Sequence, residues 1–293
     1  MCRLFGMSAG SEPAKASFWL LDAPDSLSEQ SHREPDGTGL GWFDEDGAPH
    51  VSKQPLAAYG DKRFGREAKE VSSRNFVAHV RFASTGALDL HNTHPFEQHG
   101  RLFAHNGVIE DLPALEQRLG EERRLVRGDT DSERFFALIT REIADHDGDI
   151  PAGIDTACKW VAANLPILSI NFVLATAEGL WVLRYPDTHP LYLLERDPGQ
   201  PLEHASAVGS RVHSDDGAQR PLVVIASERM DEDPGWRAIE SGQLVHVSDT
   251  LEVNRRTIFD RPPAHPLTLA DLDPAAQASQ QPAPNTPSSG EGS

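Results

Sequence analysis

The second residue of the chain is a cysteine, Cys2, directly after Met1. Cysteine is small enough for removal of the initiator methionine to be expected, which would leave the Cys2 thiol beside a free α-amino group. Reference pKa values are about 7.7–8.0 for such an amine and about 8.5 for the thiol. The amine can then act as general base for its own thiol, as histidine does in a Cys–His pair. We therefore predict that Cys2 is a nucleophile.

An arginine stands at the end of a predicted strand, residues 75–81. The alternation places His79 and Arg81 on one face of this strand. A guanidinium in such a position can bind a carboxylate through two hydrogen bonds. For a single arginine, the alternative is a surface salt bridge.

Asn106 ends a second predicted strand, residues 101–106, and Gly107 follows it. A side-chain amide followed by a glycine N–H can form an oxyanion hole, because glycine allows close approach of the backbone. The alternative is an ordinary Asn-Gly turn.

Acidic residues cluster where a helix is expected to begin. Thr130 and Glu133 have the spacing of a capping box, and apolar residues follow at helical intervals. Capping and dipole compensation explain such a cluster without any site. Because Thr130 and Glu133 fill the capping role, we expect Asp131 to be free to bind an ammonium group.

The sequence gives no support for a metal or a cofactor. The four histidines between residues 91 and 105 fit no standard zinc spacing. A Walker loop and a G-x-G-x-x-G turn after a strand are both absent from the sequence, so nucleotide binding is not expected. Cys158 falls in the apolar stripe of a predicted helix at residues 154–165, so we assign it to the core.

Composition limits the class of protein and its partners. The chain has 293 residues, a formal net charge of −18 and two cysteines. This charge disfavours nucleic acid as a partner, and two cysteines rule out a disulfide framework and suit a reducing cytoplasm. We find neither a signal peptide nor an apolar stretch long enough to cross a membrane. We therefore expect a cytoplasmic protein that acts on a small molecule.

The predicted elements alternate between strands and helical blocks. Strands are expected at residues 2–9, 75–81, 101–106, 167–176, 180–185, 191–194, 222–226 and 244–247. This order favours sheets with helices on their outer faces over regular βαβ winding. Residues 263–293 are rich in Pro, Ala, Gln and Ser, so we expect a folded domain over residues 2–262 and a disordered tail after it.

Taken in order, these segments resemble the class II glutamine amidotransferases, whose nucleophile is an amino-terminal cysteine. The matching segments are Met1-Cys2, SHREPDGTG at residues 31–39, HVRFAS at 79–84, THPF at 93–96, AHNGVI at 104–109, DTDSE at 129–133 and IASE at 225–228. The resemblance implies an α+β fold, the αββα sandwich of Ntn hydrolases, in which two antiparallel sheets lie between helices.

The resemblance also implies a role for each matched residue. Cys2 would be the nucleophile, and Asn106 with Gly107 would form the oxyanion hole. The α-carboxylate of the substrate would bind Arg81, and its α-ammonium would bind Asp131. We assign Ser84 and His79 to the same substrate pocket. The sequence departs from the family at Glu34, which stands where the family has glycine, so the local turn is altered.

The expected activity is hydrolysis of the side-chain amide of glutamine, or of another γ-glutamyl amide, through a γ-glutamyl thioester. Two alternatives stay open. The chain could be a glutaminase subunit that supplies ammonia to a separate synthetase, or a sensor that binds γ-glutamyl ligands without turnover. The sequence does not identify the amine half of the substrate, the pathway or the oligomeric state.

Overall fold

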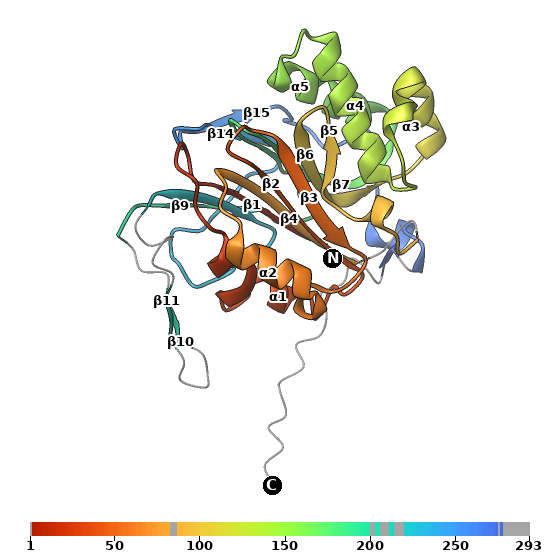
Figure 1. The fold of residues 1–293 in the computed structure, drawn as a ribbon. Helices are drawn as coiled ribbons and strands as arrows, with labels where there is room; N and C mark the ends of the chain where they lie inside the picture. Colours follow the sequence, from red (N-terminus) through yellow and green to blue (C-terminus); the bar gives the residue numbers. More distant parts are fainter. Residues whose placement is uncertain are drawn as a thin grey trace.

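The computed structural model describes residues 2–82, 87–199, 203–205, 211–213, 220–274 and 276–277. Two antiparallel sheets face each other, and helices cover the outer face of each sheet (Figure 1). The predicted αββα sandwich is confirmed. Ser84, which we assigned to the substrate pocket, lies outside the described residues.

The first sheet carries the amino-terminal strand near its middle. Its strands, in spatial order, are β13 (Arg237–Ala238), β9 (Tyr192–Arg196), β12 (Leu222–Ala226), β1 (Arg3–Ser8), β4 (Asn75–Arg81), β2 (Gly37–Phe43) and β3 (Pro49–Gln54). Because β1 pairs with both β12 and β4, the segment that begins with Cys2 is supported on two sides.

The second sheet carries the Asn106-Gly107 pair. Its order is β15 (Val253–Thr257), β14 (Gln243–Val247), β8 (Gly179–Leu183), β7 (Pro166–Thr176), β6 (Arg101–Ile109) and β5 (Phe96–Gln98). A short strand, β16 (His265–Pro266), runs parallel to β7, and β10 (Glu203–Ala205) pairs with β11 (Arg211–His213) in a separate hairpin.

The helices form two groups, one on each outer face (Figure 1). The first sheet is covered by α1 (Leu27–Gln30) and α2 (Lys62–Glu70), and the second by α3 (Leu112–Leu119), α4 (Asp131–Asp145) and α5 (Ile150–Asn164). Short helical turns are η1 (Phe18–Asp22), η2 (Ala58–Gly60), η3 (Leu90–Asn92), η4 (Gly120–Leu125) and η5 (Leu269–Asp271).

Three apolar clusters hold these layers together. Strand alternation sends Phe5 and Met7 of β1 towards the helices of the first sheet, while Leu4 packs between the two sheets. On the other side, α4 packs its phenylalanines against the second sheet, with the rings of Phe103 and Phe136 stacked at 4.7 Å. Burying apolar side chains on both faces of each sheet is the main stabilising contribution to such a sandwich.

The predicted strands and helices are present, with shifted ends. The strand expected at residues 101–106 continues to Ile109 in β6. The helix expected at residues 154–165 begins earlier, at Ile150, because the Asp149 side chain accepts a hydrogen bond from the Ala152 N–H and caps it.

The folded part of the chain extends beyond the predicted boundary at Pro262. β16 pairs with β7, and Leu272 and Ala276 are buried against Val108 and Leu168. A few apolar residues within a polar stretch are sufficient to dock it on the second sheet. The rest of the predicted tail, from residue 278, lies outside the described residues. In the part of the chain that the structure describes, no helix has the length and apolar character needed to cross a membrane.

Candidate active site

Four elements meet at a small cavity where Cys2 enters β1. The cavity has a volume of about 20 Å³ and is lined by Cys2, Arg81, Phe82, His94, His105, Gly107, Thr130, Asp131 and Ser132. The start of β1, the end of β4, the middle of β6 and the start of α4 therefore contribute to one site. This volume is close to that occupied by one water molecule.

The Cys2 thiol is part-buried and lies against the backbone of Phe82. The Phe82 N–H donates to Cys2 Sγ at 3.4 Å, and Sγ lies 3.4 Å from the Phe82 carbonyl oxygen. Burial raises the pKa of the Cys2 thiol, and Glu34 raises it further, whereas the Phe82 hydrogen bond and Arg81 lower it. The thiol therefore needs a base to become a nucleophile near neutral pH.

Arg81 is buried at the end of β4, beside the thiol. Its Nη1 donates to the carbonyl oxygen of Ala87 at 3.1 Å. Burial lowers the pKa of Arg81, and Cys2, Asp36 and Asp131 act in the opposite direction. The guanidinium thus stays charged in a site that already contains Asp131.

Asn106 and Gly107 lie within β6 and not in a turn, so the turn alternative is wrong. The Asn106 side chain is 1% exposed, and neither Oδ1 nor Nδ2 has a hydrogen-bond partner among the described residues. At Gly107 a Cβ atom would lie 1.8 Å from the carbonyl oxygen of Ser169, so only glycine fits. Gly107 lines the cavity, whereas Asn106 is not among the lining residues. A buried amide without a partner is uncommon in folded proteins and needs an explanation.

Asp131 is less free than we expected. Its Oδ2 accepts from the Ile109 N–H at 2.9 Å, and its Oδ1 accepts from the Ser132 N–H at 2.8 Å. Each carboxylate oxygen still has a second lone pair. The carboxylate therefore fixes the start of α4 against the end of β6 and keeps the capacity to accept a further donor.

His105 lies next to Ser132, the residue that follows Asp131. His105 Nε2 lies 3.3 Å from the carbonyl oxygen of Ser169, and Nδ1 lies 2.9 Å from Ser132 Oγ. Because a carbonyl oxygen only accepts, we assign the ring proton to Nε2 and let Ser132 donate to Nδ1. Burial lowers the pKa of His105, so this neutral arrangement persists at neutral pH. Sequence reasoning missed Ser132, although it directly follows Asp131.

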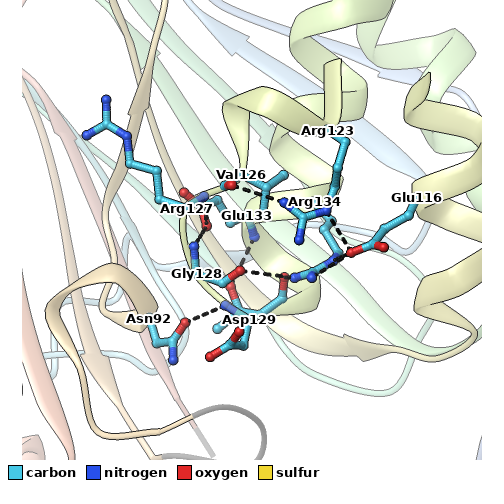
Figure 2. Close-up of polar contacts among 10 residues, drawn as sticks. Asn92, Glu116, Arg123, Val126, Arg127, Gly128, Asp129, Glu133 and Arg134 are labelled. Atoms are coloured by element: carbon cyan, nitrogen blue, oxygen red, sulfur yellow. Dashed lines mark hydrogen bonds and ion pairs between the residues drawn. The ribbon is translucent and has the colours of Figure 1, made fainter. Parts of the chain in front are cut away.

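A hydrogen-bonded network holds the loop before α4 (Figure 2). The predicted capping box forms only in part: Thr130 Oγ1 accepts from the Glu133 N–H at 3.2 Å, but Glu133 Oε2 accepts from Arg127 and Gly128 N–H groups instead. Asn92 Oδ1 accepts from the Asp129 N–H at 2.7 Å. Its Nδ2 donates to Ala87, the same carbonyl that Arg81 contacts.

His79 does not line the cavity. It is fully buried between the sheets, with its ring centroid 4.1 Å from that of His94 and the two rings tilted by 35°. Burial lowers the pKa of His79 to about 3 and holds that of His94 well below its usual range. His79 therefore supports His94, which does line the cavity, instead of contacting a substrate there.

A buried ion pair of Arg3 and Glu34 lies next to Cys2, and sequence reasoning did not predict it. Glu34 Oε1 lies 3.5 Å from Arg3 Nη1, and Arg3 Nη2 lies 2.6 Å from Glu228 Oε1. No spacing in the sequence points to this pairing, because Arg3 lies 31 positions from Glu34 and 225 positions from Glu228. Within the described ranges, no group of three His, Cys, Asp or Glu side chains is placed to hold a metal ion.

Comparison with known proteins identifies the family to which this chain belongs. The family model of the class II glutamine amidotransferases matches residues 1–268, so the chain belongs to that family and is an enzyme.

Two curated relatives cover most of the chain. It is 31% identical over 261 residues to the gamma-glutamyl-hercynylcysteine sulfoxide hydrolase of Mycobacterium tuberculosis, covering 85% of this chain and 93% of the relative. It is 26% identical to the probable glutamine amidotransferase DUG3 of Saccharomyces cerevisiae, covering 89% and 84%. A γ-glutamyl hydrolase therefore occurs among its relatives.

The solved structures that resemble this chain show the same fold. The glutamine phosphoribosylpyrophosphate amidotransferase of B. subtilis superposes with a TM-score of 0.62 at 19% identity, covering 89% of this chain. The chain spans half the length of that enzyme. At this identity the likeness shows the fold alone.

Proposed function

We propose that this chain hydrolyses the γ-amide of glutamine or of another γ-glutamyl compound to glutamate and ammonia or a free amine. One observation carries the proposal: a single cavity brings together a cysteine at the amino end, a guanidinium, a glycine of β6 and a carboxylate, namely Cys2, Arg81, Gly107 and Asp131. The γ-glutamyl hydrolase among the relatives supports it.

The α-amino-acid end of the substrate binds between opposite charges. Arg81 holds the α-carboxylate, and Asp131 uses a remaining lone pair of its carboxylate to accept from the α-ammonium. With the α-carboxylate and the α-ammonium both bound, the γ-amide reaches Cys2. Since the cavity has a volume of about 20 Å³, its lining must move to admit a glutamyl group, and binding energy from the two charges drives that movement.

Removal of Met1 during maturation frees the Cys2 amine, and acylation then follows. The amine takes the thiol proton, and the thiolate attacks the amide carbon to form a tetrahedral adduct. The Asn106 Nδ2–H and the Gly107 N–H donate to its oxyanion. As the adduct collapses, the C–N bond breaks and the ammonium of Cys2 gives its proton to the leaving nitrogen, so that a γ-glutamyl thioester forms.

Deacylation repeats these steps with water. The Cys2 amine takes a proton from water, the hydroxide attacks the thioester carbon, and the same donors stabilise the second oxyanion. Collapse breaks the C–S bond, releases glutamate and returns the proton to sulfur. No ATP or metal is used in these reaction steps.

The test is an assay of glutamate release from glutamine and a panel of γ-glutamyl amides, with and without chelator. Glutamate release by the purified chain, insensitive to chelator, is the expected result. Release that begins only when a synthetase is added would favour the ammonia-supplying subunit. Binding of γ-glutamyl ligands without glutamate release would identify a sensor and reject hydrolysis. A reducing compartment such as the cytoplasm would keep the Cys2 thiol free for this chemistry.

A further inference from the structure

Glu34 is a carboxylate buried beside the nucleophile. Its side chain is 1% exposed, and it lies just before the turn that leads into β2. A carboxylate is rarely so deeply buried unless a nearby charge compensates it. The positive charges that compensate it are the amino terminus, Arg3 and Arg33, and Arg3 Nη1 lies 3.5 Å from Glu34 Oε1.

Arg3 links Glu34 to Cys2, because Arg3 contacts Glu34 and directly follows Cys2 in the chain. The other end of the Arg3 guanidinium pairs with Glu228 at 2.6 Å. The next residue, Leu4, is fixed as well: its N–H donates to Ser227 Oγ at 2.9 Å, and its carbonyl oxygen accepts from the Ser227 N–H at 3.1 Å. The backbone that carries the nucleophile is therefore held by two distant segments.

Glu34 also acts on Cys2 through its charge. Burial raises the pKa of the Cys2 thiol, and the Glu34 carboxylate adds to that increase, whereas Arg81 opposes it. Burial also raises the pKa of Glu34 itself, while the amino terminus and Arg3 lower it. A negative charge near a thiol and an amine disfavours thiolate and favours ammonium, so both groups keep their protons to higher pH.

We propose that Glu34 is a positioning residue for the nucleophile: through Arg3 it holds Cys2 in place and keeps a negative charge next to the segment that carries the thiol–amine pair. The inference rests on the proposed function in that Cys2 is taken as the nucleophile. The thiol and the amine titrate as one coupled pair. Removing the charge of Glu34 shifts this titration to lower pH.

Other charged and titratable groups near Glu34 and Cys2 come from each neighbouring element, and the Glu34 variants leave all of them unchanged. They are Arg3, Arg33, Asp36, Arg81, His94, His105, Asp131, His189 and Glu228. The Glu228 side chain is 37% exposed and contacts the same guanidinium as Glu34. It therefore offers a matched control that perturbs Arg3 without removing the buried carboxylate.

The experiment measures the rate of alkylation of Cys2 by iodoacetamide against pH, with peptide mass spectrometry to separate Cys2 from the buried Cys158. In Glu34→Gln the midpoint should fall by about one pH unit. Glu34→Asp, which keeps the charge, should return it towards the wild-type value, and Glu228→Gln should shift it by no more than a few tenths. If Glu34→Gln folds poorly, Glu34→Gly removes the same charge and carries the same expectation.

An unchanged midpoint in Glu34→Gln, or an equal shift in Glu228→Gln, would overturn the inference. Because alkylation needs no γ-glutamyl substrate, this result is independent of whether glutamate is released. Where hydrolysis is observed, the acidic limb of kcat/KM should move in Glu34→Gln in the same direction as the alkylation midpoint.

Discussion

Asp131 Oδ2 accepts a hydrogen bond from the Ile109 N–H at 2.9 Å, which joins the first residue of α4 to the last residue of β6. β6 also carries Asn106 and Gly107. One carboxylate thus sets the spacing between the proposed α-ammonium site and the proposed oxyanion hole. A bound glutamyl group would span these two points, so the position of Asp131 affects both binding and the alignment of the γ-amide.

Asp131→Asn should separate these two roles. The asparagine side-chain oxygen can still accept from the Ile109 N–H. The charge that binds an ammonium is lost, and so is the acceptor for the Ser132 N–H, because an amide nitrogen does not accept. Loss of a buried charged contact costs on the order of 2–5 kcal/mol, so kcat/KM for a γ-glutamyl amide should fall by about 30-fold or more. The measurement compares this amide with the analogue that lacks the α-amino group. The variant should lose the preference for the amino compound; an equal loss for both compounds would contradict the assignment.

Asn106→Ala should act on turnover. Removing one oxyanion donor typically lowers kcat by about a hundred- to a thousandfold, and we expect little change in KM. Because the Asn106 amide has no partner among the described residues, the free energy of unfolding should change little.

Asn171→Ala is the matched control, because Asn171 lies opposite Asn106 on β7 but holds His189 and Tyr185 backbone groups. It should lower the free energy of unfolding by about 1–3 kcal/mol. An Asn106→Ala variant that changed KM alone would rule out the oxyanion role.

Local patterns in the sequence were sufficient for the elements that carry the site. Alternation predicted β4 with Arg81 at its end, and the order of short motifs predicted that Cys2, Asn106, Gly107 and Asp131 belong to one pocket. The cavity is lined by Cys2, Gly107 and Asp131 but not by Asn106. Strand alternation also placed His79 and Arg81 on one face, yet only Arg81 reaches the cavity.

The rest depends on contacts between distant residues, which periodicity does not report. The pairing of Arg3 with Glu34 and Glu228 requires β1 to lie beside β12. Likewise, the Thr130–Glu133 spacing predicts a full capping box, but Glu133 turns to Arg127 and Gly128 because that loop leaves two buried N–H groups to satisfy.

A chain that ends at Pro262 should be less stable than one that ends at Gln277. The shorter chain loses the pairing of β16 with β7 and the burial of Leu272. Burying one leucine side chain contributes about 1.5–3 kcal/mol, so the free energy of unfolding should fall by at least about 2 kcal/mol. Urea denaturation of the two chains measures this difference. Equal midpoints would show that the folded domain ends at Pro262, as the sequence predicted.

Stability should also fall on mild acidification. Burial lowers the pKa of His79 to about 3 in the folded protein, against about 6.5 for an unfolded histidine. Between these values the unfolded chain binds a proton that the folded chain does not, so folding weakens as pH falls below about 6.5. His79 alone should contribute a loss that approaches about 1.4 kcal/mol per pH unit. Urea denaturation from pH 7.5 to 5.5 should show this slope, and His79→Gln should reduce it. A slope that His79→Gln leaves unaltered would contradict the assignment.

The chemistry proposed for Cys2 depends on a free α-amine, and this can be measured directly. Intact-mass analysis should show loss of one methionine in active protein; full activity with Met1 retained would exclude the amine as base. A glutamine-like electrophile should label Cys2, which is part-buried and faces the cavity, and should leave the fully buried Cys158 unmodified. Cys2→Ala should abolish both labelling and glutamate release while the unfolding transition stays near that of the wild type. Loss of activity through labelling at Cys158 instead would overturn the choice of nucleophile, because burial raises the pKa of Cys158 well above its usual range and makes it a poor thiolate.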